Sequence, residues 1–157
     1  MTNKEIVLEA MRTYGKTAAM DLQERAPAMT GTEINAEDHL IPGFQEACKK
    51  MNMLHRKAGQ ADGFVCRSSA GRVVRLIQNY DSSVFTQEPE ELAAQWRFVW
   101  SKDPAKALPF ISLATSPYAA GDCCTHEGHV WRSGQDVNTW APGTPGIKWE
   151  DLGPVEA

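Results

Sequence analysis

The stretch GFVCRSSAGRVVRLIQ at residues 63–78 returns in changed form as GDCCTHEGHVWRSGQ at residues 121–135. The second copy is one residue shorter in the turn between its two β-rich runs. A tryptophan follows each copy, and the matched pairs are Cys66 with Cys124, Gly71 with Gly128, Val73 with Val130, Arg75 with Arg132, Gln78 with Gln135 and Trp96 with Trp149. A repeat of this length is typical of one supersecondary unit used in tandem. The sequence therefore predicts two small β units, which favour binding over catalysis.

Each copy predicts a β-hairpin followed by a further short strand. The expected hairpin strands are residues 65–67 with 72–78 in the first copy and residues 123–126 with 129–133 in the second. A last strand is expected at 148–152, whereas residues 96–100 form either a third strand or a short helix continuing from Pro89. We therefore expect an α+β fold, in which an N-terminal helical segment precedes two small three-stranded antiparallel β modules. The expected domains are the helical segment with its connector at 1–59, the first module at 60–100, a Pro-containing linker at 101–116 and the second module at 117–157.

The first 59 residues carry the helical signals. Residues 2–5 have the spacing of a capping box. Apolar residues then recur at intervals of three and four, namely Val7, Met11, Tyr14, Ala18 and Leu22. Gly15 costs about 1 kcal/mol in a helix interior, which leaves open two shorter helices meeting there, and Pro27 ends the segment in either case. A second helix is expected from Phe44, with apolar residues at helical spacing to Leu54, a basic finish at residues 55–57 and a stop at Gly59.

The apolar stripe of the N-terminal helix needs a cover, and two interpretations remain open. In one, the stripe docks on the first β module. In the other, it packs against the same stripe of other copies of the chain. We favour a homo-oligomer through this helix, because multivalent display converts weak sugar binding into useful avidity.

Composition excludes several classes of partner. The 157 residues include 16 Lys and Arg against 20 Asp and Glu, which gives a formal net charge of -4. The basic residues are scattered, so no nucleic-acid partner is expected. No apolar run approaches the roughly 20 residues that span a bilayer, and the start Met-Thr-Asn-Lys-Glu lacks the apolar core of a secretory signal. We expect no membrane partner, and we expect the chain to be made and to fold in the cytoplasm of its host.

The sequence predicts no catalytic residue, no cofactor and no metal site. Adjacent Cys123 and Cys124 cannot easily bridge each other, so the four cysteines are expected as free thiols. Strand alternation sends Cys124 and His126 to one face and Cys123 to the other, so this Cys- and His-rich cluster does not converge on zinc. A pair of catalytic carboxylates needs a larger framework than these units provide. The chain is therefore not expected to be an enzyme.

The second copy carries an ordered set of aromatic, Gly-Asp and turn residues. The set is Tyr118, Gly121, Asp122, Cys124, His126, Gly128, Val130, Trp131, Trp140, Pro142 and Trp149. This pattern resembles the small chitin-binding type of carbohydrate-binding module that is appended to chitinases and cellulases. The match covers residues 118–152 well and residues 63–100 more weakly. Cys124 stands where that family usually has Val, and His126 and Trp131 each stand where it has Tyr. In the first copy, Phe64 stands in for the Asp and Val74 for the aromatic residue.

The tandem arrangement after a helix, with Asp-Pro-Ala-Lys-Ala at residues 103–107, resembles the module-bearing structural proteins of tailed bacteriophages and prophages. The resemblance implies a virion protein that binds surface or mucosal polysaccharide and contacts other virion proteins. Sugars stack their C–H faces on exposed rings. The expected carbohydrate-binding residues are Trp140, Trp131, His126 and Gln135, whereas Trp96 and Trp149 are expected in the core.

Two other interpretations stay open. In the first, the chain is a particle assembly or decoration protein, its modules are spacers, and their aromatic residues face neighbouring subunits. In the second, the chain is an accessory domain of a polysaccharide-degrading enzyme. That interpretation predicts a catalytic domain on the same chain, and the sequence contains none. In all three interpretations, Trp131 and Trp140 have the alternative of filling a small core, because Trp is highly buried on average.

Overall fold

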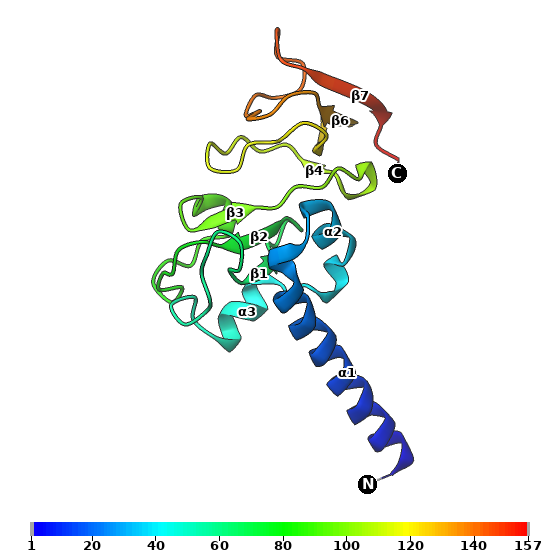
Figure 1. Ribbon diagram of the computed structural model, residues 1–157, viewed down its shortest axis with the longest axis vertical. Helices are drawn as coiled ribbons and strands as arrows, with labels where there is room; N and C mark the ends of the chain where they lie inside the picture. Colours follow the sequence, from blue (N-terminus) through cyan, green and yellow to red (C-terminus); the bar gives the residue numbers. More distant parts are fainter. Residues whose placement is uncertain (1, 157) are drawn as a thin grey trace.

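A long helix projects from the body of the molecule, and two β-sheets follow each other along the molecule's long axis (Figure 1). This computed structural model describes residues 2–156, with the side chains of residues 11–16 left out of the description. The helices gather around the first sheet, and the second sheet lies at the end of the molecule farthest from the N-terminus (Figure 1). The architecture is α+β, with one three-stranded and one four-stranded sheet.

Helix α1 (Asn3–Arg25) begins with a capping box, in which Thr2 and Glu5 bond each other's backbone N–H groups. The helix is continuous through Gly15, and the 3₁₀ turn η1 (Ala26–Ala28), which contains Pro27, follows it. Its two halves differ in packing: residues 2–10 are all exposed, whereas Leu22 is completely buried. Only the C-terminal turns of α1 therefore belong to the core of the body.

Two short helices complete the helical part: α2 (Gly31–Ala36) and α3 (Phe44–Lys50), with the 3₁₀ turn η2 (Asp38–Leu40) between them. The second predicted helix was expected to continue to a stop at Gly59, and this expectation is wrong, because α3 ends at Lys50. The chain becomes extended at Met51, and the Asn52 side-chain oxygen accepts hydrogen bonds from the backbone N–H groups of Leu54 and Ser82. These bonds replace the helical ones beyond Lys50.

Both faces of the first sheet carry buried residues. It consists of β1 (Val65–Arg67), β2 (Val73–Leu76) and β3 (Trp96–Phe98), all antiparallel in that order, with the 3₁₀ turn η3 (Pro89–Glu91) before β3. Val65 and Val73 share one face and pack with Leu22 of α1. The opposite face packs on α3 and the loops that follow it, in a cluster of Phe44, Ala47, Met53, Cys66, Val74, Leu76, Tyr80, Trp96 and Phe98.

The second sheet has four strands. They are β4 (Leu108–Pro109), β5 (Cys123–His126), β6 (His129–Ser133) and β7 (Trp149–Pro154), in that spatial order. Strands β5, β6 and β7 are antiparallel, and β4 runs parallel to β5. The predicted hairpin strands of the second copy are confirmed with the same bounds, and the tight turn at Glu127 and Gly128 has φ angles of 49° and 79°.

The expectation of only three strands in the second module is wrong, because part of the predicted linker joins the sheet. Leu108 and Pro109 pair with β5, and Phe110 donates a backbone hydrogen bond to the Thr125 carbonyl. Pro109 is tolerated because β4 is an edge strand. The 3₁₀ turn η4 (Pro104–Lys106) precedes this strand. The pairing joins residues far apart in the sequence, so strand propensity alone does not predict it.

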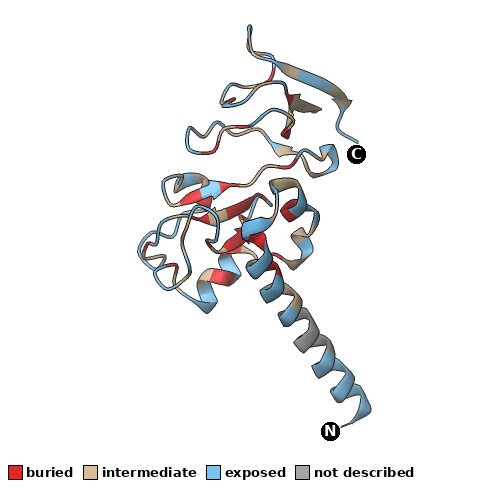
Figure 2. Ribbon diagram, viewed as in Figure 1, coloured by how far each residue is buried: buried red, intermediate tan, exposed pale blue. Residues whose placement is uncertain are grey.

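Trp100 connects the two sheets. Its ring stacks on Phe98 at 5.6 Å and on Tyr118 at 4.3 Å between centroids, and its indole N–H donates to the Ser116 carbonyl. Burial is nevertheless uneven: buried residues concentrate in the first sheet and the helices, and the second sheet is mostly intermediate or exposed (Figure 2). The second sheet therefore keeps aromatic surface that its own strands do not enclose.

Candidate functional site

One face of the second sheet carries a row of aromatic rings. Residues directly opposite each other on antiparallel strands share a face, and so do alternate residues of one strand. His129, Trp131 and Ser133 of β6 therefore share a face. Their partners His126, Cys124 and Trp149 lie on the same face. Phe110 lies 6.0 Å from His126 and 6.2 Å from Trp149, measured between ring centroids. We call Phe110, His126, Trp131 and Trp149, together with Trp140 in the loop between β6 and β7, the aromatic strip.

A buried, uncharged floor supports the aromatic strip. Tyr118 is buried and stacks on Phe110 at 5.6 Å, and Cys124 of β5, opposite Trp131, is fully buried. Burial raises the pKa of Cys124 to about 12, and burial also raises the pKa of Tyr118. Both groups therefore remain protonated at neutral pH. The floor is an apolar support for the rings above it.

The rings of the aromatic strip are exposed to different extents. Phe110, Trp131 and Trp149 are half-buried, whereas Trp140 has 48% of its surface exposed. Trp149 was expected in the core, but its side chain is only half-buried. Its ring contacts Phe110 and the buried Tyr118. Trp96, its partner in the repeat alignment, is fully buried in the first sheet as expected.

The four predicted binding residues form two separate groups. Trp131 lies at the hairpin end, where its indole N–H donates to the His126 carbonyl at 3.1 Å. Gln135 and Trp140 lie at the other end, in the loop between β6 and β7, where the Gln135 side-chain oxygen accepts from the Lys148 N–H. Trp149 joins the two groups, because it contacts Phe110 and donates its indole N–H to the Trp140 carbonyl at 2.9 Å.

The sequence analysis placed neither Phe110 nor Trp149 in the candidate site, whereas the structure puts both rings in contact on this face. Phe110 was assigned to the linker, and its pairing through β4 is what brings its ring onto the sheet. Trp149 was assigned to the core because a tryptophan occupies this place after both copies. The available signal was an aromatic residue in a Pro-punctuated segment directly before the second copy.

The loop that carries Trp140 is held in a strained but well-supported conformation. Val137 has a φ of 50°, which is unusual for a β-branched residue, and it is 68% exposed. Its neighbour Asn138 is completely buried and exchanges two backbone hydrogen bonds with Tyr118. The Asn138 side chain also donates to Ser133 and accepts from the Trp140 N–H. The loop thus presents Val137 and Trp140 from a rigid base.

Polar groups flank the hairpin end of the strip. His129 Nδ1 lies 2.9 Å from a carboxylate oxygen of Asp151, and the hydrogen bond from His129 lowers the pKa of that carboxyl below its ordinary value. The His129 ring is 6.3 Å from the Trp131 ring. An imidazole and a carboxylate beside a ring are suitable partners for the hydroxyl groups of a stacked sugar.

The equivalent face of the first sheet is covered. Val74 occupies the register position that corresponds to Trp131, and it is buried with Cys66 and Trp96 beneath Phe44 of α3. The first sheet therefore presents no ring at this place. Among the described residues, the exposed and half-buried rings of this face belong to the second sheet and its loops.

Residues 2–156 hold neither a metal-binding cluster nor a helix that could cross a membrane. Within this range, no group of three or more His, Cys, Asp or Glu side chains is placed to hold a metal ion. All four cysteines are free thiols, as expected, and three of them are buried. No helix of the described chain combines the length and apolar character needed to cross a bilayer.

Comparisons of the chain with protein-family models, with characterised proteins and with solved structures found no match. The functional assignment therefore depends on the geometry of the aromatic strip.

Proposed function

We propose that the two sheets are copies of one module of the chitin-binding type. Two pairings support the duplication. Cys66 lies opposite Val74 in the first sheet, and Cys124 lies opposite Trp131 in the second. Trp96 pairs with Leu76, and Trp149 pairs with Ser133 at the corresponding position. The first copy serves as the structural base, because helices cover both of its faces, and the second copy carries the binding surface.

The second module binds polysaccharide through the aromatic strip. The observation that carries this proposal is the set of half-buried rings on this face of the second sheet, with Trp140, 48% exposed, in the loop between β6 and β7. Sugar rings present flat C–H faces that stack on indoles, and their hydroxyls bond polar groups nearby. Gln135 at one end and His129 with Asp151 at the other supply such groups. The binding is non-enzymatic and needs no cofactor.

The biological setting that fits this module is a phage or prophage virion. There the protein attaches the particle to bacterial surface or mucosal polysaccharide and contacts other virion proteins. This setting follows from the resemblance of the tandem modules and their Pro-containing linker to the module-bearing structural proteins of phages. In this setting, the glycan is the principal partner.

Titration calorimetry of the full chain with chitooligosaccharides and with bacterial cell-wall polysaccharide tests the binding. The Trp140→Ala variant is expected to bind about tenfold more weakly, which corresponds to about 1.4 kcal/mol. Trp131→Ala is expected to weaken binding as well. Phe85→Ala is the matched control, because Phe85 is an aromatic residue 50% exposed in a loop of the first module.

Two outcomes would contradict the proposal. Unchanged affinity in both tryptophan variants would exclude the aromatic strip as the binding surface. A wild-type chain that binds no glycan, while its aromatic residues become protected in complexes with particle proteins, would favour the assembly or decoration role.

A further inference from the structure

The fixed charges of the chain are distributed unevenly along it. Residues 117–157, which form the second module, hold six Asp and Glu against two Arg and Lys, whereas residues 1–116 hold fourteen of each kind. The second module therefore carries the whole formal net charge of -4. A surface of this sign attracts cationic ligands and repels anionic ones.

Strand alternation separates the acidic and basic residues of the second sheet near the aromatic strip. Asp151 lies opposite Trp131 and shares the face of the strip, and Arg132, the next residue of β6, lies on the other face. The Gly134 N–H donates to the Lys148 carbonyl, so the register continues and Lys148 also lies on the other face. Both basic residues of the second module therefore point away from the rings of the strip.

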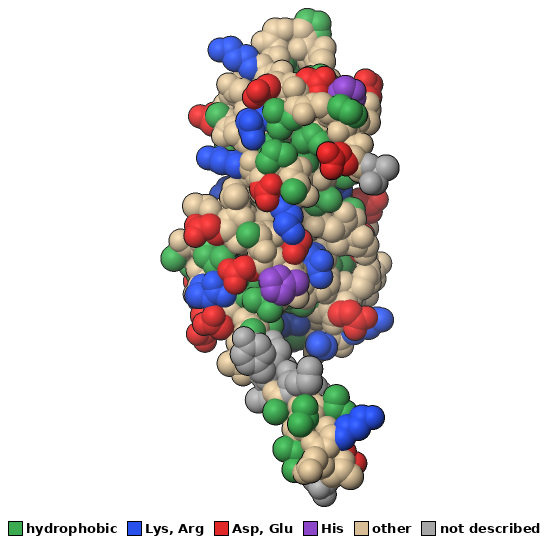
Figure 3. All heavy atoms as spheres, turned by 90° about the vertical axis from the view of Figure 1, so that its right-hand side faces the viewer, with side chains coloured by type: hydrophobic (Ala, Val, Ile, Leu, Met, Phe, Trp, Pro, Cys, Tyr) green, Lys and Arg blue, Asp and Glu red, His purple; other side chains and the backbone are tan. Residues whose placement is uncertain are grey.

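The Asp151 carboxylate is held in a fixed position beside these rings. Its Oδ1 lies 2.9 Å from His129 Nδ1 and accepts a hydrogen bond from the Gly153 N–H at 2.8 Å. The His129 ring is 6.3 Å from the Trp131 ring, and the Asp151 side chain is 44% exposed. A histidine among acidic side chains is visible at this end of the molecule in Figure 3. Asp151 is therefore an oriented and accessible carboxylate next to an indole.

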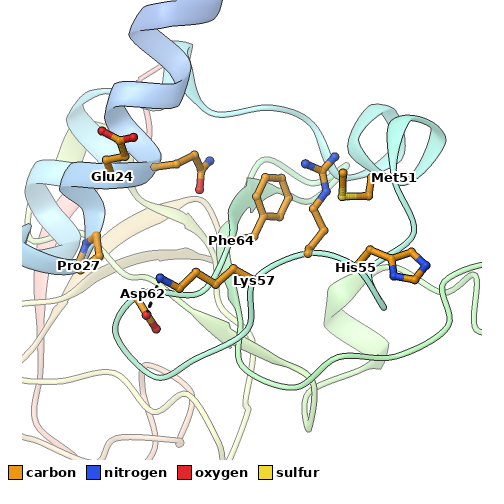
Figure 4. Close-up of a pocket in the computed structure, with 9 residues that line it drawn as sticks. Glu24, Pro27, Met51, His55, Lys57, Asp62 and Phe64 are labelled. Atoms are coloured by element: carbon orange, nitrogen blue, oxygen red, sulfur yellow. Dashed lines mark ion pairs between the residues drawn. The ribbon is translucent and has the colours of Figure 1, made fainter.

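The first module shows a ring and a carboxylate that the chain's own cations already contact. Phe64 lines a hollow of about 470 Å³ at the base of α1, together with Arg56 and Lys57 (Figure 4). The Arg56 guanidinium lies 4.3 Å over the Phe64 ring, and Lys57 pairs with Asp62 at 2.8 Å. In the second module, by contrast, the basic residues lie on the face away from the rings. A cation from a ligand can therefore bind there.

We propose that the glycan at the aromatic strip is cationic, namely a polymer rich in glucosamine units that carry a free amine. This inference rests on the function proposed above and names its class of ligand. A sugar ring stacks on the Trp131 indole, and its ammonium group binds the Asp151 carboxylate. An ammonium beside an indole is also attracted to the face of the ring. N-acetylated units keep the stacking surface but carry no charge, and anionic polysaccharides are repelled.

Titration calorimetry of the full chain compares glucosamine oligomers with N-acetylglucosamine oligomers of equal length, at a pH at which the free amines are protonated. The glucosamine oligomer is expected to bind about fivefold more tightly, as a partly exposed ion pair allows. Added salt is expected to weaken this binding and to leave that of the acetylated oligomer unchanged. Oligolysine of equal charge is the control for charge alone, and it is expected to bind more weakly because it has no flat face to stack on an indole.

Two neighbouring residues of β7 provide a matched pair of variants. Asp151→Asn removes the charge but keeps an oxygen that can accept hydrogen bonds from His129 and Gly153. It is expected to abolish the preference for the glucosamine oligomer while the affinity for the acetylated oligomer is retained, which also shows that the module is folded. Glu150→Gln makes the same change in net charge on the other face, where Glu150 lies opposite Arg132. It is expected to retain the preference.

Three results would overturn the inference. They are equal affinity of the wild type for the two oligomers, equal effects of Asp151→Asn and Glu150→Gln, and oligolysine binding as tight as that of the glucosamine oligomer. Equal affinities that both fall in Trp131→Ala would leave the proposed polysaccharide binding intact and exclude only the cationic preference. A wild type that binds neither oligomer would contradict the proposed function and this inference together.

Discussion

Val137 shows how a single residue connects local strain to the candidate site. Val137 has a φ of 50°, and a β-branched side chain is unfavourable in this left-handed region. The neighbouring Asn138 holds the backbone through Tyr118 and Ser133. The strain is therefore maintained by the residues that position Trp140, and the valine side chain itself is exposed.

Replacing Val137 with Asn is expected to stabilise the protein by about 1 kcal/mol, because Asn adopts the left-handed region more readily than a β-branched residue. Urea unfolding measures the change. Val155→Asn is the control, since Val155 is 46% exposed and does not have a positive φ. A Val137→Asn variant that is less stable than the wild type would show that the side chain makes contacts worth more than the strain. Weaker glycan binding in this variant would indicate that Val137 touches the ligand.

At the scale of elements, a buried ion pair joins the first hairpin to the second sheet. Arg72 pairs with Glu90 at 2.9 Å, and their side chains are only 10% and 16% exposed. Arg72 also donates to the Pro109 carbonyl of β4, and Glu90 accepts from the Ser68 hydroxyl. One charged cluster thus fixes the β1–β2 turn, η3 and β4 relative to one another.

Glu90→Ala is expected to lower the free energy of unfolding by about 3 kcal/mol, because it leaves the Arg72 charge buried without its partner. The double variant Arg72→Met with Glu90→Leu should lose less than the sum of the two single changes. Glu46→Ala serves as the control: Glu46 pairs with Lys49 at the surface, where such pairs contribute less than about 1 kcal/mol. Equal losses in Glu90→Ala and Glu46→Ala would show that burial of the pair has no energetic consequence.

At the scale of the whole molecule, the two sheets share one aromatic stack. Phe98, Trp100 and Tyr118 are in successive ring contact across the junction, and Cys123 donates a backbone hydrogen bond to the Ser101 carbonyl. The second sheet, whose residues are mostly half-buried, therefore depends on the first for part of its stability. We expect one cooperative unfolding transition rather than two.

Trp100→Ala is expected to destabilise the whole chain by about 2 kcal/mol and to separate the unfolding of the two sheets. Far-UV circular dichroism and tryptophan fluorescence, followed through the same urea titration, should coincide for the wild type and diverge for the variant. Trp140→Ala, which removes an exposed indole, should leave the transition single and nearly unshifted. Two separate transitions in the wild type would show that the modules are independent.

The sequence by itself determined the local elements of this protein. The hairpin strands at residues 123–126 and 129–133 were predicted with their observed bounds, because alternation and a Glu-Gly turn are local signals. The capping box at Thr2 and Glu5 was equally readable. Tertiary structure alone decided the pairing of β4, the division of the predicted site into two groups, and the cover of α3 over the first sheet. It also decided which tryptophan is buried: Trp96 lies beneath Phe44, whereas Trp149 lies on a face that no helix of the described chain covers. These outcomes depend on contacts between residues far apart in the chain, and residue spacing within one segment carries no information about them.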